Sequence, residues 1–384
     1  MLELDAVRGI ASLIVVFDHF SQLFYRHIGV SLKDPVSLLK ATPFGILIQG
    51  SSAVITFFVL SGFVLSIPFR AGGHSSISWP RFVSKRIVRL YLPFLIALAL
   101  AAAADTAFST HRIATLNTWF NTSWYRPINL RDLVSHAFLV NHFDYSEYNK
   151  AFWTLAYEMQ MSLVFPLLYF SSAKLNRYLP FFCVTLMVLG TLAIPGVNAK
   201  VMYLLSVAGM FLLGIAVAEH TKYLEYKFSG FPIALRRALS AVVVAVFAYG
   251  GIIGRAFSWI SFSAALVALA ASVTIVMALS DPAWRSFLNR PSCQFLGRVS
   301  YSLYLVHFTV LYSLIYLTQS FASSGAYWLL LFPVYVSLSL FSAWIYFTLI
   351  ERTCISLSHL VRLNRESRPL TSTTKTKPAI PGSS

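Results

Sequence analysis

The chain has 384 residues, of which 57% are hydrophobic and only 11% are charged. Such a composition leaves too few polar side chains to cover a water-soluble globule of this size, so it excludes an ordinary soluble enzyme and indicates a polytopic membrane protein. The net charge of +16 would suit a nucleic-acid-binding domain, but the Lys and Arg residues lie between apolar runs, where they set the topology of a membrane protein. We therefore expect no nucleic-acid partner.

Apolar runs long enough to cross a membrane as helices recur along the whole chain. They lie near residues 6–25, 45–68, 87–108, 152–171, 178–195, 201–219, 238–254, 258–280, 299–320 and 326–350. The loops on the N-terminal side, together with the C-terminal tail, hold twenty Lys and Arg residues, and the opposite loops hold nine. Because positively charged loops stay in the cytoplasm, both termini are predicted inside and the long loop 109–151 outside.

These runs predict an all-α membrane bundle of about ten helices, formed as one domain by residues 1–351. The remaining segment, 352–384, is mostly polar, contains proline and has no apolar period. It is predicted to be a cytoplasmic and largely disordered tail.

The first run, LDAVRGIASLIVVFDHF, carries two ionisable side chains, Arg8 and His19. Eleven positions bring a helix round to within about 20° of its start, so both side chains line one face, about 16 Å apart along the axis. With the N-terminus inside, Arg8 is predicted near the cytoplasmic surface and His19 about 9 Å below the outer end of the helix. Such groups are costly in a membrane and usually mark a pathway or a reactive site.

The third run opens with SKRIVRLYLPF, in which Arg86 and Arg89 are three residues apart on one helical face. Guanidinium groups bind phosphate through paired hydrogen bonds, so this pair at the cytoplasmic edge suits the phosphates of a nucleotide-like donor. A positively charged flank that only fixes topology, or contacts lipid headgroups, would have the same appearance.

The outer loop 109–151 combines aromatic and amide side chains in the way that sugar-binding surfaces do. It contains Trp119 and Trp124, and its candidates for binding an acceptor are Trp124, Asn141 and His142. An aromatic belt at the membrane surface would account for the same Trp residues.

The fourth run, FWTLAYEMQMSLVFPLL, carries Glu158, which is predicted about 9 Å below the outer surface. That depth equals the depth predicted for His19, so an imidazole base and a carboxylate that orients it are expected to meet there. A His and a Glu paired only for structure remain the alternative. A zinc site of His19, Glu158 and His142 lacks the dense spacing of metal ligands, and no metal is expected.

The ninth run, LGRVSYSLYLVHF, places Tyr304 and His307 on one helical face with Ser300. His307 is predicted about 12 Å above the cytoplasmic edge, on the way of a donor that enters from that side. Tyr304 and His307 are therefore assigned to donor binding. A lone histidine that only joins two helices by a hydrogen bond is the other interpretation.

Five blocks of this sequence, taken in order, resemble the acyltransferase family 3 integral membrane proteins. They are LDAVRGIASLIVVFDHF, FFVLSGFVLS, SKRIVRLYLPF, FWTLAYEMQMSLVFPLL and LGRVSYSLYLVHF, and together they extend over residues 2–351. The family's Arg and His of the first helix correspond to Arg8 and His19, its paired arginines to Arg86 and Arg89, and its fourth-block Glu to Glu158. The sequence departs from the family where Ala6 replaces a frequent Gly and where no Pro follows Arg352.

The resemblance implies an O-acyltransferase of a bacterial cytoplasmic (inner) membrane. Such enzymes acylate lipopolysaccharide, peptidoglycan, Nod factors and other glycans of the cell envelope. Acetyl-CoA or another acyl-CoA would be the co-substrate, with no tightly bound cofactor, and a glycan or lipid-linked sugar would be the acceptor. His19 would act as the base or carry the acyl group, supported by Glu158, with Arg8 beside the path of the donor.

Two other functional classes fit parts of the pattern. The same His, Glu and Arg residues in a helical bundle could serve a proton-coupled transporter or flippase. A purely structural role would leave polar groups at two depths of one helix without a purpose.

Overall fold

The computed structural model describes most of the chain. The described residues are 1–24, 35–72, 78–108, 112–125, 128–138, 147–175, 178–192, 197–256, 260–321 and 325–360. All regular elements among them are helical, as the apolar periodicity predicts. The long helices are α1 (Leu2–Ser21), α3 (Gly50–Gly72), α5 (Leu92–Phe108), α7 (Phe152–Leu175), α9 (Ala199–Glu219), α11 (Ile233–Ala256), α12 (Ile260–Ser280), α14 (Pro291–Thr318) and α15 (Gly325–Tyr346).

Shorter helices connect or extend the long ones. The α-helices among them are α2 (Pro35–Ala41), α4 (Trp79–Arg86), α6 (Leu130–Ala137), α8 (Leu179–Leu189), α10 (Thr221–Ser229), α13 (Pro282–Leu288) and α16 (Arg352–Leu360). The 3-10 turns are η1 (Gln22–Phe24), η2 (Pro43–Ile48), η4 (Phe120–Thr122) and η6 (Gln319–Phe321). Two segments are π-helical, η3 (Ile87–Tyr91) and η7 (Phe347–Glu351), and each continues directly into the next α-helix.

Eight helical segments in the described part of the chain are long and apolar enough to cross a membrane. They account for eight of the ten predicted spans, including the two around residue 255, which form separate helices. The other two predicted spans are α7 and α8. The first has 24 residues but does not belong to the eight, and the second has only 11 residues. The protein is an all-α, multi-pass membrane protein; a total of ten crossings and their orientation stay predictions.

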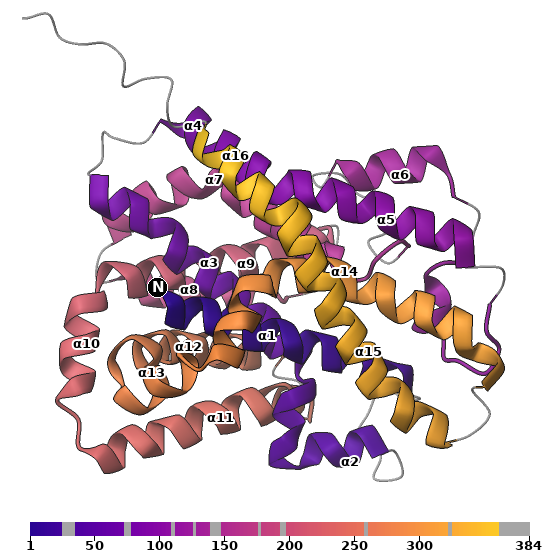
Figure 1. Ribbon diagram of the computed structural model, residues 1–384. Helices are drawn as coiled ribbons and strands as arrows, with labels where there is room; N and C mark the ends of the chain where they lie inside the picture. The colour runs from indigo at the N-terminus through magenta and orange to yellow at the C-terminus, as the bar shows by residue number, and fades with distance from the viewer. Residues whose placement is uncertain are drawn as a thin grey trace, which may run out of the picture.

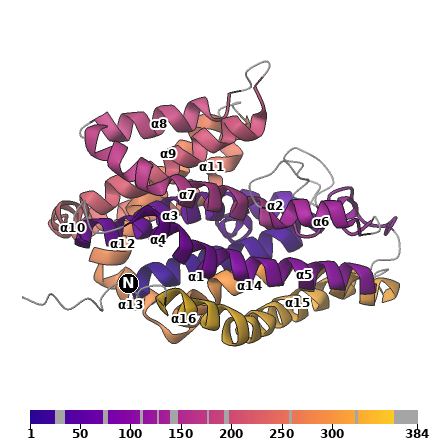
Figure 2. The same cartoon turned by 90° about the horizontal axis from the view of Figure 1, so that it is seen from above.

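The bundle has buried central helices and exposed peripheral ones. In Pro291–Phe321, 78% of the most apolar stretch is buried, whereas in Ile233–Gly251 only 17% is buried. Large apolar side chains accordingly face outward on α11 and α15, Leu329 and Leu330 among them. An outward surface of this kind is stable against lipid rather than water. Figure 2 shows α8 and α9 on one flank of the bundle and α15 and α16 on the other.

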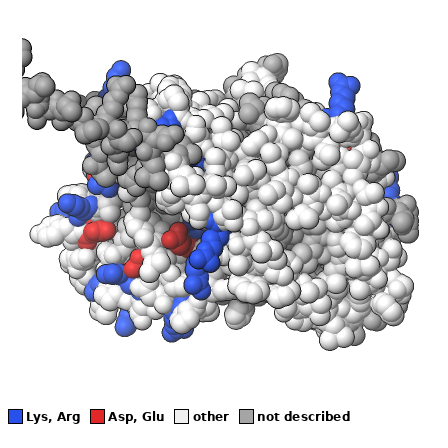
Figure 3. All heavy atoms as spheres, turned by 45° about the horizontal axis from the view of Figure 1, so that its top comes forward, with Lys and Arg blue, Asp and Glu red and all other residues white. Residues whose placement is uncertain are grey.

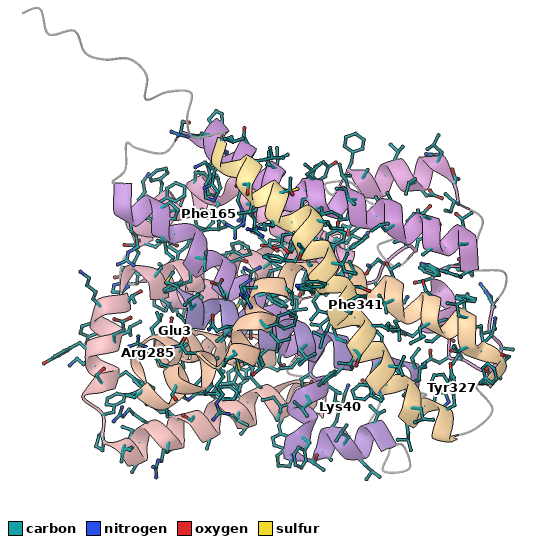
Figure 4. The ribbon with its side chains drawn as sticks, viewed as in Figure 1. Glu3, Lys40, Phe165, Arg285, Tyr327 and Phe341 are labelled. Carbon is teal, nitrogen blue, oxygen red and sulfur yellow. The ribbon has the colours of Figure 1, made fainter. Side chains whose placement is uncertain are left out.

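The ends of the bundle differ in charge. The N-terminus lies at the same end as α4, α10, α13 and α16 (Figure 1). On the face shown in Figure 3, charged side chains gather toward that end, and the rest of the face is largely uncharged. Figure 4 shows Glu3 and Arg285 next to each other at this end, where they form an ion pair of 3.5 Å, and Tyr327 at the opposite end of the molecule.

The predicted tail begins with a helix. Residues Arg352–Leu360 form α16, which packs against η3 and α4, and the rest of the tail lies outside the described residues. Cys354 and Ser358, four positions apart, are buried on one side of α16. That partly apolar face, with the packing it allows, explains why the helix continues beyond residue 351.

Candidate active site

Two glycines bring the backbones of α1 and α14 into contact. A Cβ atom on Gly9 would lie 2.4 Å from the backbone N of Gly297, and one on Gly297 would lie 2.7 Å from the backbone C of Asp5. Any side chain at either position would push the helices apart, so only glycine permits this approach. The helices run parallel, since the side chain of Gln294 donates to the carbonyl of Leu2 at their first turns.

Ten residues beyond each glycine, the two helices present histidines to each other. Nδ1 of His19 lies 2.8 Å from Nε2 of His307, and the rings stack with centroids 5.1 Å apart. Nδ1 of His307 in turn lies 2.9 Å from the carbonyl oxygen of Leu303, one turn back on α14. His307 is fully buried, whereas His19 is half-buried.

This chain of hydrogen bonds determines where the protons are. A carbonyl oxygen can only accept, so Nδ1 of His307 carries a hydrogen and donates it to Leu303. In a neutral ring, Nε2 of His307 is then an acceptor, and Nδ1–H of His19 donates to it. Nε2 of His19 is left with a free lone pair. The arrangement resembles the way in which a third group fixes the tautomer of a catalytic base.

One side of the histidine pair is lined by aromatic rings. The ring of Trp119 has its centroid 5.9 Å from that of His19, and Phe308 meets His19 edge-on at 5.7 Å. Lys150 places its ammonium group 5.3 Å from the centre of the Trp119 ring. The surroundings of the pair are therefore apolar and aromatic, with one cation at the edge.

Five charged side chains line a pocket on the same helices, at the level of Arg8 and away from the histidine pair. Its volume is about 520 Å³, including the open space at its mouth. The charged groups of this pocket, called here the arginine pocket, are Arg8, Arg86, Arg89, Glu158 and Glu351. Three guanidinium groups against two carboxylates leave an excess of positive charge.

The two carboxylates of the arginine pocket are already engaged. Glu158 accepts a hydrogen bond of 3.3 Å from Ser61 and lies 3.7 Å from the guanidinium of Arg86. Glu351 is buried, and its Oε2 accepts from the backbone N–H and the hydroxyl of Ser302, at 3.2 and 2.5 Å.

The other two arginines of the pocket, Arg8 and Arg89, have no carboxylate within ion-pair distance in the described part of the chain. Two guanidinium groups that share one pocket without a direct carboxylate partner suit an anionic ligand with several oxygens, such as a phosphate.

Both π-helical segments contribute to the arginine pocket. Arg89 and Leu90 belong to η3, and Glu351 is the last residue of η7. The hydroxyl of Tyr301, which also lines the pocket, donates to the carbonyl of Leu90 at 2.6 Å and so satisfies a backbone group of η3. Single π turns inside α-helices occur frequently at functional sites, because they redirect a side chain.

A second pocket, called here the connecting pocket, adjoins the arginine pocket and extends toward the histidine pair as far as Tyr304. It has a volume of about 380 Å³, again with open space included, and it shares Arg8, Glu158 and Tyr301 with the arginine pocket. At its other side it reaches Thr154 and Tyr304. The ring of Tyr304 has its centroid 6.0 Å from that of His307. The two pockets thus extend from the arginines to Tyr304, and neither is lined by His19 or His307.

Comparison with known proteins identifies the family. The family model described as an acyltransferase domain, of the acyltransferase 3 type, matches residues 1–348. The chain belongs to the acyltransferase 3 family. It is also 37% identical over 101 residues to "Protein 2 in picA locus" of Rhizobium radiobacter, a match over 26% of this chain and 43% of that relative. The chain thus spans less than half the length of this curated relative. No solved structure matches.

The pairing predicted for His19 and Glu158 is wrong. His19 contacts His307 instead, and Glu158 lies with Arg86 and Ser61 in the arginine pocket. The start of α7 is covered by other parts of the protein, since Ala151 and Phe152 are completely buried, so the apolar edge of the fourth run does not mark a surface from which the depth of Glu158 could be counted.

The residues assigned to donor binding separate into two groups. Arg86 and Arg89 line one pocket as expected, and Arg8 joins them. Tyr304 lines the connecting pocket, with its hydroxyl hydrogen-bonded to Thr154 and to the carbonyl of Ala151. His307 lines neither of these two pockets and lies against His19, so its position corresponds to a support for the base rather than a ligand of the donor.

The prediction for Trp124 also needs correction. The side chain of Trp124 is 1% exposed, and its indole N–H donates to the carbonyl of Tyr148 at 2.9 Å. The hydroxyl of Tyr316 donates to the backbone carbonyl of Trp124. Burial likewise raises the pKa of the Tyr148 hydroxyl to about 12. Trp124 has a φ of 53°, which an aromatic residue adopts only when its surroundings enforce it. It holds the outer loop together instead of contacting a substrate. Asn141 and His142 lie outside the described residues.

Three residues near these groups were not predicted from the sequence. They are Glu351, Lys150 and Ser61, which is the hydrogen-bond partner of Glu158. The signal for Glu351 was its position as a lone carboxylate at the end of the last apolar run. Among the described residues, no group of three His, Cys, Asp or Glu side chains could hold a metal ion.

Proposed function

We propose that this acyltransferase moves an acyl group, most simply acetyl, from cytoplasmic acyl-CoA to a hydroxyl of an extracytoplasmic glycan or lipid-linked sugar. The observation that supports the proposal is the pair of His19 and His307, in which the bond to Leu303 leaves Nε2 of His19 as a free base. A base of this kind is what an acceptor hydroxyl needs in order to attack a thioester.

The arginine pocket would bind the phosphates of the donor. Arg8 and Arg89 lack a direct carboxylate partner among the described residues, and Arg86 shares its charge with Glu158. Phosphate oxygens that enter the pocket would complete the hydrogen bonding of these guanidinium groups. The pantetheine arm, which separates the phosphates from the thioester, would then follow the connecting pocket past Tyr304 toward His19.

The transfer step needs only the groups already described. Nε2 of His19 takes the proton of the acceptor hydroxyl as the oxygen attacks the thioester carbonyl carbon. The tetrahedral intermediate collapses, the carbon–sulfur bond breaks, and the imidazolium of His19 returns the proton to the departing CoA thiolate. The products are an ester and free CoA thiol. His307 holds the ring of His19 in the required tautomer during both proton transfers.

The orientation inferred from charge would put the arginine pocket on the cytoplasmic side and the histidine pair toward the outer side of a bacterial inner membrane. A cytoplasmic donor could then acylate envelope polysaccharide such as lipopolysaccharide without leaving the cell. The transporter or flippase alternative receives no support from the family comparison.

The proposal can be tested with purified protein in detergent, without any membrane gradient. Labelled acetyl-CoA should lose its acetyl group to envelope glycan or to water, in a reaction that His19→Ala abolishes. A transporter would not consume the thioester under these conditions, so an intact donor after long incubation would exclude the proposal. Acetyl found on His19 itself after rapid quenching would replace the general-base route by a covalent one.

A further inference from the structure

Two side chains of the outer region accompany His19 and have no part in the chemistry described above. Trp119 lies beside the imidazole, with ring centroids 5.9 Å apart, and Lys150 lies over the indole of Trp119 at 5.3 Å. All three side chains are half-buried, so each is both held by the protein and partly exposed.

Trp119 is attached to the helix that carries His19. The side-chain amide of Asn117, two residues before it, donates to the carbonyls of Gln22 and Leu23 at 2.7 and 3.2 Å, just beyond the end of α1. Phe120, the next residue, stacks on Tyr312 of α14 with centroids 4.2 Å apart. These anchors fix the indole between α1 and α14. Its N–H has no hydrogen-bond partner among the described residues.

Lys150 is attached to the helix that carries His307. Asn149, immediately before it, is fully buried and donates its side-chain amide to the carbonyl of Leu305 at 3.0 Å. Leu305 is only two residues from His307. On the outer side, the Lys150 ammonium donates to the hydroxyl of Thr122 at 2.6 Å. The buried bond of Asn149 thus fixes the chain next to Lys150, and an exposed bond to Thr122 holds the ammonium.

We propose that Trp119 and Lys150 form the acceptor subsite, and that this subsite selects a sugar whose reacting hydroxyl lies next to an anionic group. The proposal rests on the proposed transferase function. An indole beside the base suits the apolar face of a sugar ring, and its free N–H can donate to a ring oxygen or hydroxyl. An ammonium held over one face of the same indole attracts a carboxylate or a phosphate.

The test compares matched acceptors with purified protein and labelled acetyl-CoA. The acceptors are a neutral oligosaccharide, the same sugar as its uronic acid, and the same sugar carrying a phosphate. For the unmodified protein we expect kcat/KM for one or both anionic acceptors to exceed that of the neutral one about tenfold, as a charged hydrogen bond to Lys150 would give. The two anionic arms distinguish carboxylate from phosphate recognition.

Two variants separate the contributions of the subsite. Lys150→Gln should lower kcat/KM for the anionic acceptors to that of the neutral sugar, whereas Arg131→Gln, which removes an exposed cation in the outer loop, should keep the preference. Trp119→Ala should lower kcat/KM for every sugar about tenfold and leave acetyl-CoA hydrolysis by water intact, which shows that the protein is folded. Trp328→Phe, at another ring of the outer end, serves as its control.

Three results would overturn the subsite. They are equal use of neutral and anionic acceptors by the unmodified protein, a preference that survives in Lys150→Gln, and transfer to no sugar while hydrolysis that depends on His19 continues. In each case the proposed chemistry at His19 stands. If the unmodified protein neither transfers nor hydrolyses the acetyl group, the proposed function itself fails, so the two failures are distinguishable.

Discussion

The histidine pair and the arginine pocket lie on the same helices, yet their surroundings differ in every respect. Around His19 and His307 the neighbours are aromatic rings, and the pair has one short hydrogen bond of 2.8 Å. The arginine pocket is charged, open at its mouth, and leaves Arg8 and Arg89 without direct carboxylate partners among the described residues. A neutral pair among aromatic rings suits proton transfer, whereas an open cationic pocket suits the binding of a charged ligand. The comparison teaches that a single helix face can carry two chemically different environments along its length.

The largest effect on the rate of acetyl transfer is expected from a substitution of His19. His19→Ala should lower the rate of acetyl transfer by about 10²- to 10⁴-fold, the contribution typical of a general base, with donor affinity unchanged. The measurement is transfer of labelled acetyl together with acetyl-CoA binding to the same preparation. His220→Ala is a matched control, because that histidine lies at the C-terminal end of α9 and bonds only to the carbonyl of Ala216. Full activity of His19→Ala would contradict the division into two regions.

His307→Asn tests whether the second histidine acts through the first. The substitution removes the acceptor nitrogen that fixes His19, so kcat should fall about 10- to 100-fold, as is usual when a supporting partner of a functional His is lost. KM for acetyl-CoA should stay the same, because His307 lines neither of the two pockets assigned to the donor. A raised KM for acetyl-CoA with an unchanged kcat would show that His307 binds the donor.

The double substitution Arg86→Gln with Arg89→Gln should weaken only the binding of the acetyl-CoA donor. We expect KM for acetyl-CoA to rise about tenfold, since a charge-assisted hydrogen bond contributes about 1.5–3 kcal/mol and its replacement by an amide loses part of that. Activity with acetyl-pantetheine, which carries no phosphate, should not change. Equal losses for both donors would show that the arginines maintain the fold and do not contact phosphate.

The smallest effect on the reaction is expected where only the distance between helices changes. Gly297→Ala places a Cβ atom 2.7 Å from the backbone of Asp5, so α1 and α14 must separate slightly, at a cost of about 1–3 kcal/mol in stability. Thermal unfolding in detergent measures this loss. Gly230→Ala is the control, because the nearest atom to its new Cβ would be 3.5 Å away. Equal melting temperatures of the two variants would contradict the close approach of the helices.

The fold could be predicted largely from hydropathy, because apolar runs of membrane length have few structural alternatives. The exceptions are α7 and α8. In α7, Glu158 and other polar residues face the protein interior instead of lipid, and α8 is too short to cross a membrane on its own. Local composition does not reveal where a helix begins relative to the surface. That information lies in tertiary contacts such as the bond from Asn149 to Leu305.

For the candidate site, the sequence predicted which residues matter better than which of them meet. Spacing on one face correctly grouped Arg86 with Arg89. Depth estimates paired His19 with the wrong partner, because they took the apolar edges of two runs as the membrane surface. A different signal was present: the distances from Gly9 to His19 and from Gly297 to His307 are both ten residues. Equal spacing from a glycine contact predicts that the two histidines coincide, but only once α1 and α14 are known to be parallel neighbours.

The equal spacing from glycine to histidine brings two imidazoles that are 288 positions apart in the chain to the same height along their helices. One residue added between the glycine and the histidine of either helix would turn that imidazole by about 100° and raise it by about 1.5 Å. The membrane helix would remain intact and still insert, since its hydropathy would hardly change. The two imidazoles would nevertheless no longer meet, so under the proposed function such an insertion would abolish acetyl transfer while the protein still inserts into the membrane.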